Sequence, residues 1–401
     1  MIPLLEGVRV LDLCRLGVAA TMRLADLGAE VIKIEEPPYG DYLRGLPPIS
    51  SEHGIGLFYL MLNRNKKSLG LNLKSDEGRR IFFELLATSD VIVELSKPGT
   101  FERLGLDYES VRRAKPDIIY CSVTGYGLTG PYRDLPSHGM NIDAAGGLLH
   151  IERNSDGRPE IAMASALGLE MGGANAALAV AAALYRRSVT GEGTYLDISC
   201  WDGAVAANSA IPPALNLGPD DTFDHPLRPG GPGPKYNVYG TKDDKVLLIC
   251  PIEKKFWVAF CRAADKEEWA ERGCYDGPMD YGESDQTLRE DIETVMRTRT
   301  LDDWMQTLLA ADVPVSPVLE PSDLPDNPHA EARQMFAQSD DPRYQGLRFV
   351  TVPVRMMGAE WSVALPPPVL GEQTLEIMRG LGYDEAAQAR LKAAGVIAAI
   401  S

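Results

Sequence analysis

The sequence has few cysteines, and no two of them form a C-x2-C pair. Six cysteines scattered over 401 residues argue against a zinc site or a disulfide framework, and favour reduced thiols. The longest apolar block, Ala176 to Tyr185, is too short to cross a bilayer. The first residues lack both the charged start and the cleavage pattern of a signal peptide. We therefore expect a cytoplasmic protein without a metal site and without a membrane partner.

Basic residues are also in short supply. The chain has 40 Lys and Arg against 57 Asp and Glu, which gives a formal net charge of -17. A strongly acidic protein is repelled by nucleic acids and by anionic membranes, so we expect neither as a partner. An anionic ligand would need a local cluster of Lys and Arg. With 45% hydrophobic and 24% charged residues, the chain is long enough for two globular domains.

A glycine-rich dinucleotide motif is missing from an otherwise suggestive opening. The segment 8–13 has the pattern of a buried strand, 21–27 that of a helix, and 30–34 that of a second strand followed by Glu35. This βαβ order favours nucleotide binding, but the turn 14–20 lacks G-x-G-x-x-G. A nicotinamide enzyme is therefore only a second interpretation.

Strand and helix patterns continue to alternate along the chain. We expect a helix over 76–87 with Ser75 as its N-cap, strands at 91–93, 118–123 and 194–200, and a long Ala-rich helix from 172 to 185. The order predicts an α/β fold with a Rossmann-like, doubly wound parallel sheet. Pro and Gly crowd the region before Pro234. We predict a large domain over 1–210, a linker over 211–234, a smaller α+β domain over 235–320, and a return of the chain to the large domain over 321–401.

Glu170 stands at the start of the Ala-rich helix. Free backbone N–H groups and the helix dipole stabilise an anion at such a position, so this carboxylate should stay ionised and is suited to act as a nucleophile. The alternative interpretation is a helix-capping or solvated glutamate.

Several phrases together resemble family III coenzyme A transferases, a family that includes α-methylacyl-CoA racemases. The resemblance is carried in order by 3–13, 24–35, 63–68, 96–99, 101–105, 124–132, 187–193 and 370–374. It implies coenzyme A as substrate, acyl-CoA and carboxylic acids as partners, and a homodimer of interlocked subunits. It also implies a large Rossmann-like domain built from both ends of the chain.

The resemblance also assigns contacts to coenzyme A. Where several family members have an arginine after the second strand, this chain has Glu36, so its grip on the phosphates must differ. For each Lys or Arg considered singly, an ordinary solvated surface charge is the alternative. The implied contacts are Leu16, Gly17, Val18, Lys74, Lys97, Arg103, Tyr126 and Gly127.

The catalytic residues of the family are only partly present. Its transferases use an aspartate where this chain has Gly168 or Leu169, and Glu170 is the neighbouring acid. His138 matches the racemase histidine and Glu253 a supporting acid, so an α-methylacyl-CoA racemase remains an alternative, as does an inactive CoA-binding subunit. His138 as a structural histidine is also open. Gly230, Gly231 and Gly233 match a loop that closes over the family's active site, and a plain linker is the other interpretation.

Overall fold

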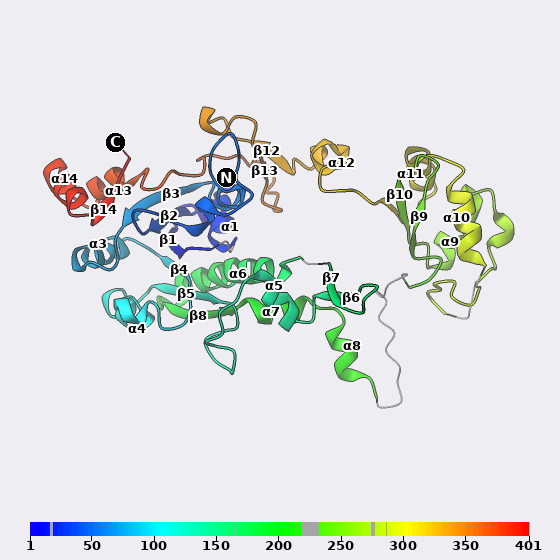
Figure 1. The fold of residues 1–401 in the computed structure, drawn as a ribbon. Coiled ribbons are helices and arrows are strands. Elements are labelled where there is room, and N and C mark those ends of the chain that lie inside the picture. The colour runs from blue at the N-terminus through cyan, green and yellow to red at the C-terminus, as the bar shows by residue number, and fades with distance from the viewer. Residues whose placement is uncertain (17–18, 164, 219–231, 274–276, 286, 401) are drawn as a thin grey trace. The chain divides into compact units, whose positions relative to one another are not determined.

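The computed structural model describes residues 1–16, 19–163, 165–218, 232–273, 277–285 and 287–400 (Figure 1). The chain divides into two compact units. The first unit joins Met1–Ile211 to Ala332–Ser401, and the second is Pro212–Glu331. The first unit is thus assembled from both ends of the chain. The two units are described separately below.

A seven-stranded sheet forms the centre of the first unit. Its spatial order is β14-β3-β2-β1-β4-β5-β8, and every neighbouring pair is parallel except β14 with β3. The prediction of an α/β fold with a mainly parallel sheet is confirmed. The strands are β1 (Arg9–Cys14), β2 (Glu30–Glu35), β3 (Lys66–Leu71), β4 (Val91–Leu95), β5 (Ile119–Thr124), β8 (Thr194–Ser199) and β14 (Ile397–Ala398).

Helices cover both faces of this sheet, which is why its central strands are apolar on both sides. On one face, Ile92 and Tyr120 pack with Phe82 from α3. On the other face, Val93 and Cys121 pack with helices whose buried side chains are largely alanine. The first face is covered by α3 (Asp76–Leu86), α4 (Tyr108–Ala114), α13 (Thr374–Gly380) and α14 (Glu385–Ala393), and the second by α1 (Ala20–Asp26), α5 (Gly139–Ala145), α6 (Leu167–Thr190) and α7 (Cys200–Ala207).

The Ala-rich helix α6 is longer than the sequence predicted and begins at Leu167. Its small residues allow close packing on α7, since a Cβ added to Gly172 would lie 2.4 Å from Cys200 Sγ. By length and composition α6 would pass as a membrane-spanning helix, as the core helices of globular proteins also do. Ala176 and Val180 of α6 are fully buried against the sheet.

Buried ion pairs lock the first three strands together. Asp12 on β1 lies beside Lys33 on β2, and its carboxylate is 2.9 Å from Lys66 Nζ on β3. Lys33 Nζ in turn lies 2.7 Å from Asp41. Burial acts to raise the pKa of Asp12, but the charges of Lys33 and Lys66 outweigh it and hold the pKa below its usual range. These pairs hold β1, β2 and the beginning of β3 together from within the sheet.

The rest of the first unit is made of smaller elements around the sheet. Two hairpins stand apart from it, β6 with β7 and β12 with β13. Ile151 and Ile161, which face each other across the first hairpin, are both about half exposed. The elements are α2 (Leu57–Leu62), β6 (His150–Arg153), β7 (Pro159–Met163), β12 (Phe336–Gln338) and β13 (Arg348–Val350).

The second unit has a three-stranded antiparallel sheet in the order β11-β10-β9, and its own core. Trp257 and Trp304 are both buried there. Helix α8 occupies the start of the stretch predicted as a linker. The elements are α8 (Ile211–Asn216), β9 (Asn237–Gly240), β10 (Val246–Ile249), α9 (Lys254–Ala263), α10 (Leu288–Met296), α11 (Leu301–Ala310), β11 (Val315–Pro317) and α12 (Pro328–Ala332).

Candidate active site

The carboxyl edge of the large sheet is where a ligand is expected. The strand order reverses between β1 and β4, and ligands of doubly wound sheets bind outside the carboxyl ends of the strands at such a point. Charged residues follow these strands directly. Arg15 comes after β1, Glu36 after β2 and Lys97 shortly after β4. The edge therefore offers positive charge on a protein that is acidic overall.

Two cations at this edge share one acid. Glu36 Oε2 lies 3.3 Å from Arg15 Nη1, and Glu36 Oε1 pairs with Lys74 Nζ. The Lys74 side chain is 69% exposed and that of Arg15 is 43% exposed. The structure thus brings the predicted contact Lys74 together with Arg15, which the sequence did not single out.

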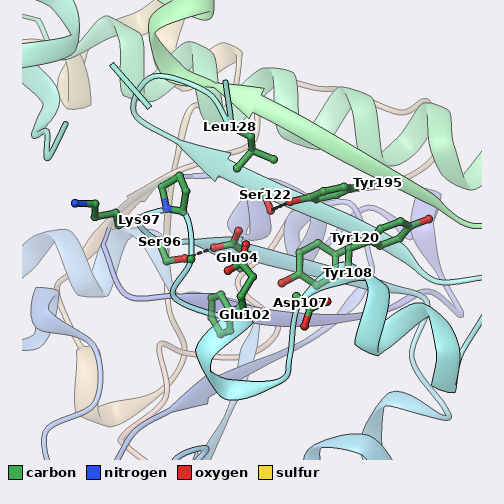
Figure 2. A pocket seen from close by; sticks show the side chains of 13 residues that line it. Glu94, Ser96, Lys97, Glu102, Asp107, Tyr108, Tyr120, Ser122, Leu128 and Tyr195 are labelled. Carbon is green, nitrogen blue, oxygen red and sulfur yellow. Dashed lines mark hydrogen bonds between the residues drawn. The ribbon is translucent and has the colours of Figure 1, made fainter. Parts of the chain in front are cut away.

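A pocket opens on the α4 side of the same edge (Figure 2). Glu94 lines this pocket, and its carboxylate accepts a hydrogen bond from Ser96 Oγ at 2.6 Å. Ser122, opposite Glu94 on β5, lies 3.1 Å from the Tyr195 hydroxyl. Lys97 also lines the pocket, but its ammonium points away from Glu94 in Figure 2.

Glu94 is the most perturbed acid of this pocket. Only 5% of the residue is exposed. Burial raises its pKa to about 7, against the opposing effect of hydrogen bonds from Ser122 and Ser96. Glu94 therefore changes protonation near neutral pH, and in its protonated form it can donate a hydrogen bond to a neutral ligand group.

The start of α6 is closed by an acid from another helix. Asp143 on α5 is 1% exposed, and it accepts hydrogen bonds from the Gly168 amide at 2.8 Å and the Leu167 amide at 3.1 Å. The Ser165 hydroxyl donates to the same carboxylate at 3.0 Å. Ala166 precedes the helix with a φ of +53° and offers no side-chain cap. Asp143 is thus the cap of α6, and it touches the amide of Gly168, where the family aspartate is missing.

Glu170 lies in the first turn of α6, but its carboxylate pairs with a neighbouring helix rather than with the backbone amides of α6. Its side chain is 57% exposed and pairs with Arg23 Nη2 of α1 at 2.8 Å. An anion here is favoured by the helix dipole and by the guanidinium. Glu170 and Asp143 are therefore two carboxylates near one helix start, the first open to solvent and the second buried.

His138 stands next to this region. It directly precedes α5, it is exposed, and its amide donates to Asn141 Oδ1 at 2.9 Å. A Cβ added to the adjacent Gly139 would lie 3.0 Å from side-chain atoms of both Ala166 and Leu169. The structure thus brings the backbone beside His138 against the α6 turn that carries Glu170.

The remaining predicted contacts are spread along the edge. Tyr126 is largely buried and its hydroxyl donates to the Asn141 carbonyl at 3.4 Å, so its loop lies against α5. Gly127 has a φ of +88°, which favours glycine there. Leu16 and Arg103 are exposed. Gly17 and Val18 lie outside the described residues.

Glu253 and Gly233 belong to the second unit. Glu253 immediately precedes α9, and its side chain makes no capping hydrogen bond there. Gly233 is tightly enclosed, since a Cβ would lie 2.4 Å from the Tyr281 carbonyl oxygen. The predicted loop residues Gly230 and Gly231 lie outside the described residues.

Three residues of this region were not singled out from the sequence. Arg15 follows the first strand directly, a position that the strand pattern could have indicated. Glu94 is an acid inside an apolar strand, which is a sign of a buried carboxyl. Asp143 carried no local signal, because its partners lie 24 and 25 residues further along the chain.

Comparison with known proteins agrees with this architecture. The model of CoA-transferase family III matches residues 5–374. The chain is 32% identical to the succinyl-CoA:glutarate CoA-transferase of Homo sapiens, over 98% of this chain and 90% of that protein. It is 30% identical to the acetyl-CoA:oxalate CoA-transferase of Acetobacter aceti, over 95% of this chain and 96% of that protein. A CAIB/BAIF family protein from Brucella suis superposes with a TM-score of 0.74 at 26% identity, covering 95% of this chain and 99% of that one.

The chain therefore belongs to CoA-transferase family III, as the sequence predicted. It is an enzyme that transfers coenzyme A.

Proposed function

We propose that this enzyme moves coenzyme A from an acyl-CoA to a free carboxylic acid, with Glu170 as the carboxylate that carries the acyl group and then CoA. The supporting observation is the exposed Glu170 side chain in the first turn of α6, 2.8 Å from Arg23. The guanidinium and the helix dipole favour the ionised carboxylate, which is the form that attacks a carbonyl carbon. Asp143, in contrast, is buried and bound by two amides and a hydroxyl.

The reaction then proceeds in four balanced transfers. A Glu170 oxygen attacks the thioester carbonyl, which gives a mixed anhydride and releases CoA thiolate. The thiolate attacks the Glu170 carbonyl carbon, which gives a glutamyl-CoA thioester and releases the first acid. The acceptor carboxylate attacks that thioester and again releases CoA thiolate. The thiolate finally attacks the acceptor's acyl carbon, so the new acyl-CoA leaves and Glu170 is restored as a carboxylate.

A dicarboxylic acid is the proposed acceptor. The names of the related transferases include glutarate, oxalate and mesaconate, all of which are dicarboxylates. We therefore expect succinyl-CoA with glutarate, mesaconate or oxalate to be the first pairs worth assaying. Transfer with none of these pairs, but with a monocarboxylic acid, would overturn the choice of acceptor.

Chemical trapping tests the role of Glu170. Enzyme incubated with acyl-CoA and hydroxylamine, or reduced with borohydride, should carry its modification on the peptide that contains Glu170. Glu170→Gln should abolish both transfer and labelling. Glu192→Gln is the matched control, because Glu192 is an exposed acid paired with Arg186 just beyond the other end of α6. Label on the Asp143 peptide instead would reject Glu170 and assign the chemistry to Asp143.

An α-methylacyl-CoA racemase is the second candidate. It is favoured by the place of His138, whose neighbour Gly139 packs against the start of α6. In this proposal His138 exchanges the α-proton with Glu170 or Glu253 as the second acid/base. Solvent deuterium should then enter the α-carbon of a 2-methylacyl-CoA, and His138→Ala should stop the exchange. Transfer without any exchange would exclude this candidate.

We propose that coenzyme A lies along the carboxyl edge of the large sheet. Its proposed contacts among the described residues of the first unit are Leu16, Lys74, Lys97, Arg103, Tyr126 and Gly127. Gly17 and Val18, outside the described residues, are proposed as well. The glycines Gly230, Gly231 and Gly233 are proposed to shield the reactive anhydride from water. Lys97→Met should raise the KM for acyl-CoA, whereas an unchanged KM would remove Lys97 from the site.

We also propose that the enzyme is a homodimer with interlocked subunits. Leu178, Tyr185 and Val189 form an exposed apolar stripe on α6, each between 69% and 74% exposed. A stripe of this kind needs a cover, and a second copy of the chain is the proposed one. Light scattering should give twice the chain mass, and Leu178→Glu should reduce it. A monomeric wild type at micromolar concentration would contradict the proposal.

A cytoplasmic location, without nucleic-acid or membrane partners, is part of the same proposal. It is supported by the net charge of -17, which repels both kinds of polyanionic surface. Cell fractionation checks it, and recovery of the enzyme in the membrane fraction after a salt wash would contradict it.

A further inference from the structure

Three charged side chains at the carboxyl ends of β1, β2 and β3 form what we call the Arg15–Glu36–Lys74 bridge. Each oxygen of the Glu36 carboxylate serves one cation, Oε2 lying 3.3 Å from Arg15 Nη1 and Oε1 pairing with Lys74 Nζ. A two-oxygen anion between an arginine and a lysine is also how proteins hold a phosphate group. The bridge is therefore built like an occupied phosphate site, with a side chain as the occupant.

A second bridge of the same composition lies at the amino ends of the same strands. Glu30 Oε2 is 2.7 Å from Arg9 Nε, and Glu30 Oε1 is 3.0 Å from Lys67 Nζ. These cations are less exposed, with side-chain values of 32% for Arg9 and 25% for Lys67, against 43% for Arg15 and 69% for Lys74. The amino-end bridge is compact, whereas the carboxyl-end bridge is open to solvent.

Arg15 has hydrogen-bonding capacity left over. Its Nε atom is buried and makes no hydrogen bond to the part of the chain that the structure describes. The Arg15 guanidinium carbon lies over the Tyr42 ring, 4.8 Å from its centre, in a cation–π contact. With two cations and one anion, the bridge keeps one net positive charge at the edge of the sheet where ligand phosphates bind.

We propose that the Glu36 carboxylate occupies the place of a phosphate group, and that the ribose phosphate monoester of coenzyme A displaces this carboxylate from Arg15 and Lys74 on binding. The inference rests on the proposed function only in taking coenzyme A as the ligand. The displaced carboxylate remains close to the bound phosphate and repels it. Glu36 therefore weakens the binding of coenzyme A and of its thioesters, which speeds the release of the acyl-CoA product and lowers the affinity for the acyl-CoA substrate.

Binding measurements on the full-length enzyme test this role. Calorimetry with CoA and with 3′-dephospho-CoA should be run on the wild type and on Glu36→Gln, Arg15→Met and Lys74→Met. Glu30→Gln is the matched control, since it removes the same charge from the same kind of bridge at the opposite edge. Thermal melting shows whether each variant is folded, and Glu36→Ser replaces Glu36→Gln if the latter is not.

The expected pattern is specific. Glu36→Gln should bind CoA about tenfold more tightly at low salt, because one repulsive charge is gone. The gain should shrink as ionic strength rises. The affinity of Glu36→Gln for dephospho-CoA should equal that of the wild type. Arg15→Met and Lys74→Met should weaken CoA binding, whereas Glu30→Gln should bind CoA as the wild type does.

Several results would overturn the inference. The first is an affinity of Glu36→Gln for CoA that is unchanged or weaker than that of the wild type. The second is an equal gain in affinity for dephospho-CoA, which would place the diphosphate rather than the ribose phosphate at the bridge. The third is an equal gain in CoA affinity from Glu30→Gln. In each case the wild type still binds CoA, so the proposed function stands. A wild type that binds no CoA at all would instead overturn the proposed function.

Discussion

Asp143 Oδ1 accepts a hydrogen bond of 2.8 Å from the backbone amide of Gly168. This contact joins α5 to the start of α6, whose own N-cap residue Ala166 makes no side-chain capping hydrogen bond. The position at which the family resemblance places an aspartate on α6 is therefore met by a carboxylate from a different helix. The contact ties the stability of α6 to the region that carries Glu170.

Removal of Asp143 should destabilise the first unit. Asp143→Ala leaves the buried Gly168 amide without its acceptor and leaves the Leu167 amide with Ser165 Oγ alone, so we expect a loss of about 2 to 4 kcal/mol in the free energy of unfolding. Asp384→Ala is the control, because Asp384 caps α14 at an exposed site through the Ala387 amide and should cost about 1 kcal/mol. Urea denaturation compares the two variants. Equal losses of stability would contradict the larger contribution expected from the buried Asp143.

Glu94 should make stability fall as pH rises. Its pKa is about 7 in the folded protein against 4.5 ordinarily, so between these values the folded state holds a proton that the unfolded state has lost. Relative to Glu94→Gln, the wild type should lose about 3 kcal/mol between pH 4.5 and 7 and lose no more above pH 7. Urea denaturation of both proteins at pH 5, 6, 7 and 8 checks this. A constant difference across the series would refute the assignment of the raised pKa to Glu94.

The buried Lys66 should matter far more than its neighbour Lys67. Lys66 Nζ lies 2.9 Å from Asp12, and Lys66→Met leaves that buried carboxylate with a partner fewer, at a cost of about 3 to 5 kcal/mol. Lys67 pairs with Glu30 and Glu376 nearer the surface, so Lys67→Met should cost less than about 1 kcal/mol. Denaturant unfolding measures the stability of both variants. Similar losses would show that the buried Lys66–Asp12 pair contributes no more than the pairs of Lys67.

The second unit should fold without the first. Residues 232–331 are continuous in sequence and contain the core around Trp257 and Trp304. Expressed alone, they should unfold cooperatively, and Trp304→Ala should lower their stability by about 3 to 5 kcal/mol. Leu309→Ala is the control, since Leu309 is 74% exposed and should change stability by less than about 0.5 kcal/mol. A gradual melt of the isolated fragment would show that the unit depends on the rest of the chain.

The sequence predicted the fold where local patterns are strong. The buried strands at 9–14 and 30–35 and the helix between them follow from mainly apolar runs, although Asp12 interrupts the first strand and Lys33 the second. Ser75 was correctly expected as the N-cap of α3, and its hydroxyl accepts from the Gly78 amide at 3.0 Å. The strand Lys66–Leu71 was not predicted as such, because it opens with two lysines. Lys66 can be buried there because Asp12, 54 residues earlier, neutralises its charge, and because Thr21 and Asn63 accept its other hydrogen bonds.

The site was harder to predict, for the same physical reason. Glu170 forms an ion pair with Arg23, and Asp143 caps α6 through the Gly168 amide. Both contacts join distant parts of the chain. Local propensity contains no information on such pairs. Positions directly after a strand, such as Arg15 and Glu36, are the exception, because the parallel sheet alone brings them to one edge.

One edge strand of the large sheet, β14, comes from a part of the chain far from its partner. β14 (Ile397–Ala398) pairs with β3 (Lys66–Leu71), so β3 stays unpaired on one side until residues 397–398 have been synthesised. An open strand edge invites pairing with other chains. A protein without residues 397–398 would therefore keep an intact second unit but expose an unpaired edge of β3, and it should aggregate before it loses its chemistry.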